Sequence, residues 1–599
     1  MRKELLLLGA FGMLTTATLC AQEFHLQPTP QEYITQKDSV DIPRQYQILS
    51  GNSVQDGPAL PLLRSLMPEE VLGASFRVYI GVKGDKIIKK YQHRIPRKSE
   101  GYFLKIEKDC IVIAGADERG AYYGVQTLAQ LLALDKLPLA EVTDYPDVPY
   151  RGVVEGFYGA PWSQEARIRQ LDFYGRNKMN VYIYGPKDDP YHRTPNWRKP
   201  YPAREGEELK VLVNRAKENN VIFYWAIHPG QDIRWNEEDR SLLLQKFESM
   251  YQLGVRGFAV FFDDISGEGT KADKQAELLN YIDDHFVKVK RDVAPLILCP
   301  TEYNKSWTDV EGGYLTTLGD KLNEGIKVMW TGDMVVATID KSTLDFVNPL
   351  LKRKAYIWWN FPVSDYVQDH LLLGPVYGNG LDIKDDMSAF VSNPMEHAEA
   401  SKISLYSVAD YTWNMENYDS ETSWKHAVRD LMPLHAEYLE IFAAHNSDPG
   451  QNGHRFRREE SVAIQPALSA LLKAYQEKNE IDEDAYRQVA EECRKIIVAA
   501  DGLLASRNEN RPLITEIRPW LIQFKQVGEY GAEVLNMIRL RQQKDAFIGS
   551  YEHARALLVL MGETDAQYKA GIKSGSLHLM PTFNALFEAA TTGYNAAFH

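Results

Sequence analysis

The feature that most constrains the fold is a series of short apolar, β-rich runs that begins after Arg151. Eight such runs occur, at residues 152–159, 180–186, 221–230, 257–264, 296–303, 327–333, 355–362 and 402–410. The segments between them are long enough for amphipathic helices. Apolar strands that alternate with such helices are typical of a parallel sheet covered by helices. Eight units over about 260 residues therefore predict an α/β fold, a (β/α)8 barrel.

A doubly wound open sheet is the alternative fold. It usually has fewer strands, and it binds phosphate through a glycine-rich loop after the first strand. No such loop follows the first run here. The barrel therefore remains the preferred prediction.

Changes in pattern on both sides of the barrel predict two further domains. Residues 22–147 combine the strand-like "CIVIAGAD" with a helical pattern, which indicates an N-terminal α/β domain. We place the barrel at residues 148–445, after the proline-containing "DYPDVPYRG". A polar connector, "HNSDPGQNGHRFRREE", follows, and then only helical patterns. We expect a helical bundle in residues 446–599, with Pro519 near a helix start.

The first residues, "MRKELLLLGAFGMLTTATLCAQ", have a basic start, an apolar run and small residues near Cys20 and Ala21. This pattern predicts a signal peptide at residues 1–21, cut after Ala21, and an exported protein, either periplasmic or secreted. A buried helix fits less well because polar residues resume at once. A lipid anchor on Cys20 also fits less well, because "ATL" is a poor lipidation signal. No other run reaches about 18 apolar residues, so we expect no transmembrane segment.

Charge and cysteine content exclude several classes of protein. The formal net charge is -14, and no long Lys/Arg block offsets it, which argues against a nucleic-acid partner. Without the signal peptide, three scattered cysteines remain, Cys110, Cys299 and Cys493. Their spacing makes neither a disulfide framework nor a zinc site.

Polar and aromatic residues gather where the predicted strands end. In a (β/α)8 barrel these ends share one face and build one pocket. The residues at the ends of the first seven runs are Gly156, Tyr158, Lys187, Asp188, His228, Asp263, Asp264, Glu302, Tyr303, Thr331, Asp333, Trp358, Asn360 and Asp365. Carboxylates, amides and aromatic rings around a cleft suit a neutral ligand rich in hydroxyl groups.

The adjacent acids Asp263 and Asp264 raise a specific question. Consecutive strand residues point to opposite faces, but at a strand end the chain turns, so both can enter the pocket. Ordinary retaining glycosidases place two carboxyls about 5 Å apart, on opposite sides of the sugar. An adjacent pair instead suits a 2-acetamido sugar whose acetamide oxygen attacks its own anomeric carbon. Repulsion and burial would then raise the pKa of one acid.

Two other interpretations of the pair stay open at this point. Asp264 could cap a helix while Asp263 is solvated, as is common for two adjacent aspartates. A Mg²⁺ site would draw acids from several strands, and Asp188, Glu302 and Asp333 are scattered candidates.

The sequence resembles glycoside hydrolase family 84. The resemblance rests on ordered motifs that include "RGVVEGFYGAPWS", "YIYGPKDDPYH", "FAVFFDDISGEG", "CPTEYNKSW", "YIWWNFPVSDY" and "SNPMEHAEASKI", and it spans the whole chain. It implies an exo-acting, retaining β-N-acetylglucosaminidase of the O-GlcNAcase type. Such an enzyme works through an oxazoline and needs no metal or cofactor.

The resemblance also implies roles for individual residues. Asp263 would orient the acetamido nitrogen, Asp264 would act as acid and then base, and Tyr303 would bind the acetamido oxygen. The remaining implied contacts are Cys299, Thr331 and Trp358 around the N-acetyl methyl, Gly156 and Lys187 on the 3-hydroxyl, Asn360 and Asp365 on the 4- and 6-hydroxyls, Asn393 near the acetamide, and Tyr158 in the wall.

Several residues keep a purely structural interpretation. Trp359 points away from Trp358 on a strand and is expected in the core. His228 is a strand-end residue that we leave outside the catalytic set, and Glu302 is expected to be an ion-pair partner. The partners would be glycans or glycoproteins that end in GlcNAc. A hyaluronidase-like endo-enzyme and a non-catalytic glycan-binding protein are the alternative functions.

Overall fold

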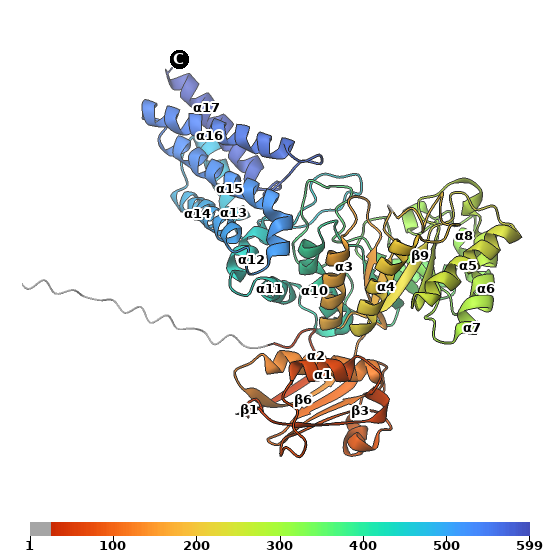
Figure 1. The fold of residues 1–599 in the computed structure, drawn as a ribbon. Helices are drawn as coiled ribbons and strands as arrows, with labels where there is room; N and C mark the ends of the chain where they lie inside the picture. The colour runs from red at the N-terminus through yellow and green to blue at the C-terminus, as the bar shows by residue number, and fades with distance from the viewer. Residues whose placement is uncertain (1–24, 188, 599) are drawn as a thin grey trace, which may run out of the picture.

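The computed structural model describes residues 25–187 and 189–598. The chain forms an N-terminal sheet domain, a closed barrel and a helical region at the C-terminal end (Figure 1). The predicted signal peptide, residues 1–21, and Asp188 lie outside the described residues. Within the described residues, no helix is both long and apolar enough to span a bilayer.

The N-terminal domain is a six-stranded mixed sheet in the order β1-β6-β4-β5-β3-β2. Its strands are β1 Glu32–Val40, β2 Gln47–Ser50, β3 Arg77–Val82, β4 Tyr102–Ile106, β5 Cys110–Gly115 and β6 Leu137–Asp144. Helices α1 (Ala59–Leu66) and α2 (Glu118–Leu132) bury apolar residues in one core with the sheet. The short helices η1 (Asn52–Val54) and η2 (Lys86–Arg94) complete the domain, and Ile88 of η2 belongs to a second, smaller core.

Eight parallel strands close the barrel, because the last strand, β14, pairs with the first, β7. The strands are β7 Tyr150–Glu155, β8 Val181–Tyr184, β9 Ile222–Ile227, β10 Gly257–Phe261, β11 Ile297–Cys299, β12 Lys327–Trp330, β13 Ala355–Trp359 and β14 Met387–Ser392. The predicted (β/α)8 barrel, with an α/β domain before it and helices after it, is therefore confirmed.

The strands are buried on both faces. Alternate residues fill the barrel interior, among them Phe261, Cys299 and Trp358. The residues between them pack outward against the helices, and these include Phe262 and Trp359. Trp359 is fully buried, which confirms its expected place in the core.

The position of the eighth strand was predicted wrongly. Residues 402–410 lie inside α10 (Ala398–Trp413), and the strand is β14 at Met387–Ser392. Every residue of α10 is buried. A helix that is buried all round lacks the apolar stripe that marks a helix in the sequence. Its Ile, Leu, Tyr and Val residues therefore matched a strand, while the short "MSAFVS" gave a weak strand signal.

Helices follow most of the strands and cover the barrel (Figure 1). They are α3 Gln164–Arg176, α4 Ala203–Glu218, α5 Glu237–Gln252, α6 Ala272–Ile282, η4 Asp283–Val287, α7 Lys288–Lys290, α8 Tyr314–Lys321, α9 Lys341–Leu351 and α10. Short helices η3 (Gly267–Thr270) and η5 (Lys305–Trp307) lie in the loops after β10 and β11. After β13, residues 360–386 form a long loop without a helix, and this loop reaches the pocket described below.

The C-terminal part is helical throughout. Its elements are η6 Met415–Asn417, α11 Ser420–Leu431, α12 Ala436–Ala444, α13 Gln465–Lys478, α14 Glu483–Ala505, α15 Arg511–Arg539, α16 Lys544–Ala566 and α17 Leu579–Phe598. Pro519 lies inside α15, so the predicted helix start there is wrong. The helix begins at Arg511, where Asn510 caps it and Pro512 occupies its first turn, as is typical for proline. Glu516 of α15 accepts hydrogen bonds from the amides of Glu399 and Ala400 and so caps α10.

Buried charges join the N-terminal domain to the barrel. Lys178 Nζ lies 3.1 Å from Asp144 Oδ2, and Arg151 lies 2.7 Å from a carboxylate oxygen of Glu100. Trp413 donates from Nε1 to Asp144 at 2.8 Å. Because these groups are buried, each must have a partner for the domains to dock.

Candidate active site

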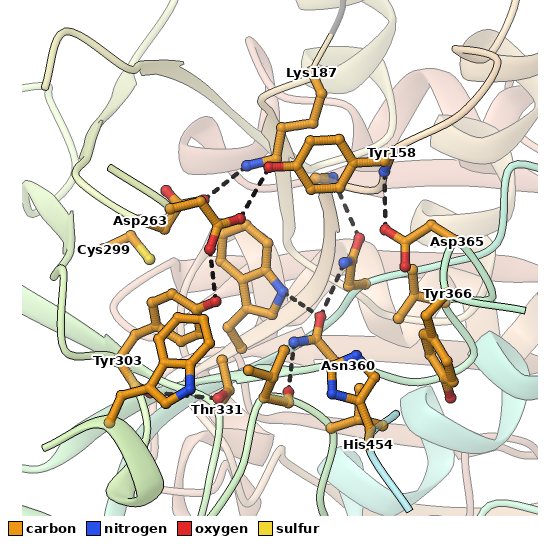
Figure 2. Close-up of a pocket in the computed structure, with 18 residues that line it drawn as sticks. Tyr158, Lys187, Asp263, Cys299, Tyr303, Thr331, Asn360, Asp365, Tyr366 and His454 are labelled. Carbon is orange, nitrogen blue, oxygen red and sulfur yellow. Dashed lines mark hydrogen bonds and ion pairs between the residues drawn. The ribbon is translucent and has the colours of Figure 1, made fainter. Parts of the chain in front are cut away.

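The carboxyl ends of the barrel strands surround a cavity of about 400 Å³. All twelve predicted site residues line this cavity: Gly156, Tyr158, Lys187, Asp263, Asp264, Cys299, Tyr303, Thr331, Trp358, Asn360, Asp365 and Asn393. In Figure 2, Asp263, Cys299 and Tyr303 lie on one side of the pocket, and Asp365, Tyr366 and His454 lie on the other.

The two acids enter the pocket because the chain turns at Asp264. Along the end of β10, Phe261 points into the barrel and Phe262 points outward. By alternation Asp263 points inward again. Asp264 has φ = 52°, in the left-handed region, which breaks the alternation. Both carboxylates therefore face one cavity, as the sequence predicted.

Asp263 is buried and held by two cationic or polar neighbours. Lys187 Nζ lies 2.7 Å from its Oδ2, and His228 Nε2 lies 3.4 Å from its Oδ1. Burial raises the pKa of Asp263, but Lys187 and His228 outweigh this effect and hold the pKa well below the usual range. Within the described protein, the buried Oδ1 accepts no hydrogen bond. The carboxylate therefore offers one free acceptor atom.

Asp264 lies between two phenols. Tyr303 donates to its Oδ1 at 2.8 Å, and Tyr158 donates to its Oδ2 at 2.9 Å. The pKa of both tyrosines is raised, first by burial and then by the charge on Asp264, and the pKa of Tyr158 reaches about 12. Both phenols therefore remain protonated donors at neutral pH.

One sequence interpretation of the pair is wrong. Asp264 caps no helix, since the next helix, η3, begins at Gly267 after Ser266, and Asp263 is buried rather than solvated. The buried acid Asp263 has a lowered pKa because Lys187 and His228 lie beside it. The expectation that one acid of the pair has a raised pKa is therefore not met by Asp263, and it stays a prediction for the pair.

Apolar groups form the floor beside the acids. Cys299 and Trp358 end the packed interior of the barrel and line the cavity. Thr331 joins them, and its hydroxyl donates to the carbonyl of Met334 at 3.0 Å. A Cβ at Gly156 would lie 2.5 Å from Trp358 Cζ2, so the indole ring requires glycine there. The floor is therefore a tight apolar niche.

Amide and carboxylate groups line the opposite wall. Asn360 Oδ1 accepts from Trp358 Nε1 at 2.8 Å and from Asn393 Nδ2 at 2.9 Å. Asp365 accepts from the amide of Tyr158 at 2.9 Å, and burial raises its pKa. These bonds fix the orientation of each group, while part of each still faces the cavity.

The sequence did not single out six lining residues: Trp307, Val335, Val336, Val363, Tyr366 and His454. His454 comes from the polar connector after the barrel, and its ring meets that of Tyr366 edge-on, with centroids 4.9 Å apart. Tyr366 lies in the loop after β13, one residue past Asp365. The sequence could have indicated Tyr366 as a pocket residue, because it directly follows the predicted site residue Asp365. Nothing in the sequence indicated that His454 lines the pocket.

Three residues at strand ends do not line the pocket: His228, Glu302 and Asp333. Glu302 accepts from the amide of Asp309 at 3.1 Å and has no ion pair in the described protein, so its predicted role as an ion-pair partner is wrong. Two of the three acids considered for Mg²⁺, Glu302 and Asp333, therefore lie outside the cavity lining, and the third, Asp188, is not among the described residues.

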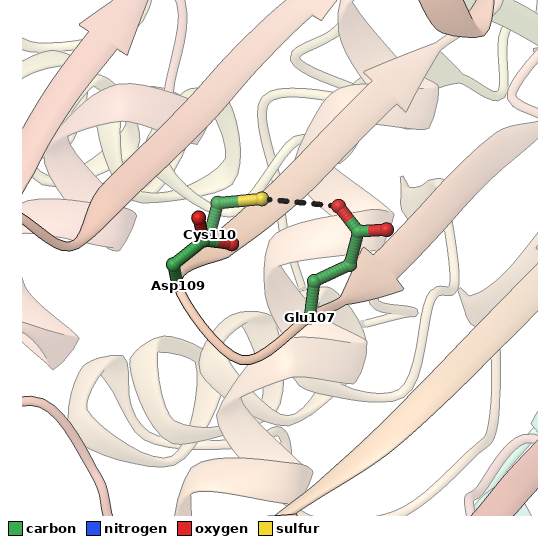
Figure 3. Close-up of side chains that lie close together, drawn as sticks. All are labelled: Glu107, Asp109 and Cys110. Carbon is green, nitrogen blue, oxygen red and sulfur yellow. Dashed lines mark hydrogen bonds between the residues drawn. The ribbon is translucent and has the colours of Figure 1, made fainter.

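One group of described side chains has the proximity for a metal ion, on the turn between β4 and β5 in the N-terminal domain. Glu107, Asp109 and Cys110 bring ligand atoms within 4.8 Å of one another (Figure 3). Burial and Glu107 raise the pKa of the Cys110 thiol to about 12, so it donates to Glu107 rather than binding as a thiolate. Glu107 also pairs with Lys105 at 2.9 Å. We assign no metal to this group.

A closed (β/α)8 barrel with paired carboxylates, phenols and amides over an apolar niche defines the class of barrel glycoside hydrolases. Residues 151–444 match the family described as beta-N-acetylglucosaminidase, and residues 460–587 match the bacterial GH84 post-catalytic domain. Residues 23–145 match domain 2 of glycosyl hydrolase family 20.

Comparisons with individual proteins agree with these family matches. The chain is 31% identical to CpGH84B, with a TM-score of 0.86 over 94% of this chain and 100% of that one. A mutant O-GlcNAc hydrolase from Thermobaculum terrenum is 26% identical, with a TM-score of 0.65 over 75% of this chain and 97% of that one. The protein O-GlcNAcase of Rattus norvegicus is 35% identical over 276 residues, which are 44% of this chain and 30% of the rat protein. The match thus spans less than a third of that relative. The chain belongs to glycoside hydrolase family 84.

Proposed function

We propose that the chain is an exo-acting, retaining β-N-acetylglucosaminidase in which the acetamido group of the substrate is the nucleophile. The observation that carries this proposal is the pair on β10. Among the described residues no donor reaches the buried Oδ1 of Asp263, and Asp264 lies beside it between two phenols. The family relationship supports the sugar, since relatives are named O-GlcNAc hydrolase and O-GlcNAcase.

In the first step the acetamido oxygen attacks the anomeric carbon. The bond from that carbon to the leaving oxygen breaks, and Asp264 gives the leaving oxygen a proton. Asp263 accepts the acetamido N–H on its free oxygen and stabilises the positive charge that develops on the nitrogen. The product of the step is a bicyclic oxazoline in its protonated form, whose N–H stays hydrogen-bonded to Asp263.

In the second step Asp264 takes a proton from water, and the water oxygen attacks the same carbon. The bond from the oxazoline oxygen to that carbon breaks, which restores the acetamide. Two inversions give net retention, without the pair of carboxyls about 5 Å apart across the sugar that ordinary retaining enzymes use.

Tyr303 has a second function in this scheme. Its hydroxyl donates to Asp264 in the free protein, and a donor to a carboxylate favours the ionised form. When substrate binds, the hydroxyl moves to the acetamido oxygen. Asp264 is then released from this hydrogen bond and can face the leaving oxygen.

The rest of the pocket accounts for recognition of the sugar. Cys299, Thr331 and Trp358 enclose the acetamido methyl, and Lys187 with the backbone of Gly156 binds the 3-hydroxyl. Asn360 and Asp365 bind the outer hydroxyls, and Asn393 lies near the acetamide. The wall that carries Asp365, Tyr366 and His454 closes the pocket beyond the sugar, which favours terminal GlcNAc on glycans or glycoproteins.

Aryl β-GlcNAc substrates test the proposal. Asp264→Ala should slow a substrate with a poor leaving group far more than one with a good leaving group, because a good one needs little protonation. Asp263→Ala should slow both alike. Replacing acetyl by trifluoroacetyl on the sugar should lower the rate of the unmodified enzyme strongly, and an unchanged rate would rule out attack by the acetamide.

Two further measurements test the exo assignment and the chemistry. NMR should show β-GlcNAc as the first product. Hyaluronan should yield no internal cuts, and internal cuts would favour the endo alternative. Binding of GlcNAc without any turnover would favour a glycan-binding protein.

A further inference from the structure

His228 lies directly beside the acid pair although it does not line the cavity. It follows β9 (Ile222–Ile227) and is buried, with only 5% of its surface exposed. Its backbone amide donates to the carbonyl of His192 at 2.7 Å. The imidazole is thus fixed at the end of one strand and points toward the end of the next, where the acids lie.

The imidazole of His228 contacts the backbone between Asp263 and Asp264. His228 Nε2 lies 2.8 Å from the main-chain oxygen of Asp263. A carbonyl oxygen only accepts, so Nε2 carries the hydrogen and donates it. The peptide unit that holds this oxygen joins Asp263 to Asp264. His228 therefore holds the peptide unit at which the chain leaves the strand and turns at Asp264.

That peptide needs support because Asp264 has φ = 52°. Left-handed backbone is unfavourable for a residue with a Cβ, and it persists where the surroundings hold it. In an extended strand the two acids would point to opposite faces. The left-handed turn at Asp264 is what brings its carboxylate to Tyr303 and Tyr158.

The same imidazole also faces the side chain of Asp263. Its Nε2 lies 3.4 Å from Oδ1, while Lys187 binds Oδ2 at 2.7 Å. Because the hydrogen on Nε2 is directed to the backbone oxygen, Oδ1 still accepts no hydrogen bond in the described protein. His228 thus stays close to Asp263 without filling the acceptor that the proposed function assigns to the substrate.

We propose that His228 is a positioning residue, which anchors the Asp263–Asp264 peptide so that two consecutive carboxylates enter one pocket. The consequence for turnover rests on the proposed function. His228 touches no substrate in this account. It acts through the turn, so its loss should affect both acids together.

Two substitutions of His228 separate the effect of its N–H donor from the effect of its side-chain volume. Gln places an amide N–H near the position of Nε2, so His228→Gln keeps the donor, whereas His228→Met fills similar space without one. A displacement of about 1 Å at catalytic groups can lower a rate by about a hundredfold. We therefore expect His228→Met to lower kcat by about a hundredfold with either a good or a poor leaving group, and His228→Gln to stay within about tenfold of the unmodified enzyme.

A combined variant and a control test the mechanism. On a background that lacks both carboxylates, Asp263→Ala with Asp264→Ala, His228→Met should lower the residual kcat on the substrate with the good leaving group by less than about threefold further, because both groups that it positions are already gone. His192 is a buried neighbour whose Nδ1 contacts the carbonyl of Ala226 at 3.1 Å. It makes no contact with the acids, and Asn keeps a donor near Nδ1. His192→Asn should leave kcat within about threefold.

The proposal is overturned if His228→Met keeps kcat, if His228→Gln is as slow as His228→Met, or if His228→Met costs as much on the background without both carboxylates as it does in the unmodified enzyme. Crystal structures of both variants give a readout that needs no turnover. Residue 264 should leave the left-handed region in His228→Met and keep it in His228→Gln, and an unchanged turn in His228→Met also overturns the proposal. If the unmodified protein releases no GlcNAc, the proposed function fails, and these structures still decide the role of His228.

Discussion

The hydroxyls of Tyr303 and Tyr158 both donate to the carboxylate of Asp264, but the two tyrosines differ in burial. Tyr303 is buried, whereas Tyr158 is half-exposed, with 46% of its surface accessible. We predict that Tyr303→Phe lowers kcat by about a hundredfold, the loss typical of one donor to a developing charge. Tyr158→Phe should lower it by about tenfold or less, since water replaces an exposed hydrogen bond. Steady-state kinetics on one aryl β-GlcNAc compares the two, and equal losses would contradict the assignment of Tyr303 to the acetamido oxygen.

The ionisation of Asp263 gives a second prediction at this scale. Burial raises its pKa, while Lys187 and His228 lower it by a larger amount, so the folded protein keeps Asp263 ionised well into acid. Lys187→Met removes the closer cation, 2.7 Å away. The pKa of Asp263 should then rise, because burial is no longer offset as strongly.

The measurement for Lys187→Met is the pH profile of kcat/KM. Activity that needs ionised Asp263 is lost as the pH falls through its pKa, so the acid limb of the profile should move to higher pH. Lys305→Met is a matched control, since Lys305 lies 3.9 Å from Asp333, away from the acid pair. An acid limb that stays in place in Lys187→Met would show that Lys187 does not control Asp263.

At the scale of elements, patterns in the sequence predicted seven of the eight strands. Ten of the fourteen strand-end residues that they gathered line the cavity, whereas His228, Glu302 and Asp333 do not, and Asp188 lies outside the described residues. This succeeded because parallel strands buried on both faces give continuous apolar runs, and because their carboxyl ends share one side of a barrel. The sequence patterns did not predict strand β14, because it is short and contains serine and alanine. Asn393 follows it directly, and only the family resemblance pointed to that residue.

Contacts between distant segments were not predictable from local patterns. The polar connector gave no periodicity, yet it brings His454 to the pocket beside Tyr366. The left-handed turn at Asp264 leaves no trace in the sequence either, because an acidic pair after a strand is compatible with several turns. Which groups hold that turn depends on His228 from another strand.

His454, on the polar connector after the barrel, is expected to contribute to substrate binding. His454 lines the far wall, and no hydrogen bond joins its imidazole to another described residue. We expect His454→Ala to raise KM by about fivefold to tenfold, equivalent to one hydrogen bond to an outer hydroxyl, with little change in kcat. Glu459→Ala is the control, because Glu459 lies on the same connector, is exposed and does not line the cavity. A fall in kcat without a change in KM would place His454 in catalysis instead.

At the scale of the whole molecule, a buried ion pair joins the N-terminal domain to the barrel on the side away from the pocket. Asp144 of β6 meets Lys178 at 3.1 Å, and both side chains are at most 1% exposed. Tyr102 and Trp413 also donate to Asp144, at 2.6 and 2.8 Å. Such a pair adds little by itself, but removing one partner leaves an uncompensated buried charge.

We therefore predict that Lys178→Met lowers the free energy of unfolding by about 3 to 5 kcal/mol. Adding Asp144→Asn should recover part of this loss, because no charge then remains buried. Arg176→Ala is the matched control, since it breaks an exposed pair with Asp430 at 2.8 Å and should change stability by less than about 1 kcal/mol. Denaturant unfolding measures all three variants, and kcat below the transition should stay within about twofold, because the catalytic end of the barrel is not altered. Equal destabilisation by Lys178→Met and Arg176→Ala would mean that water reaches this contact and that the two domains are not docked through it.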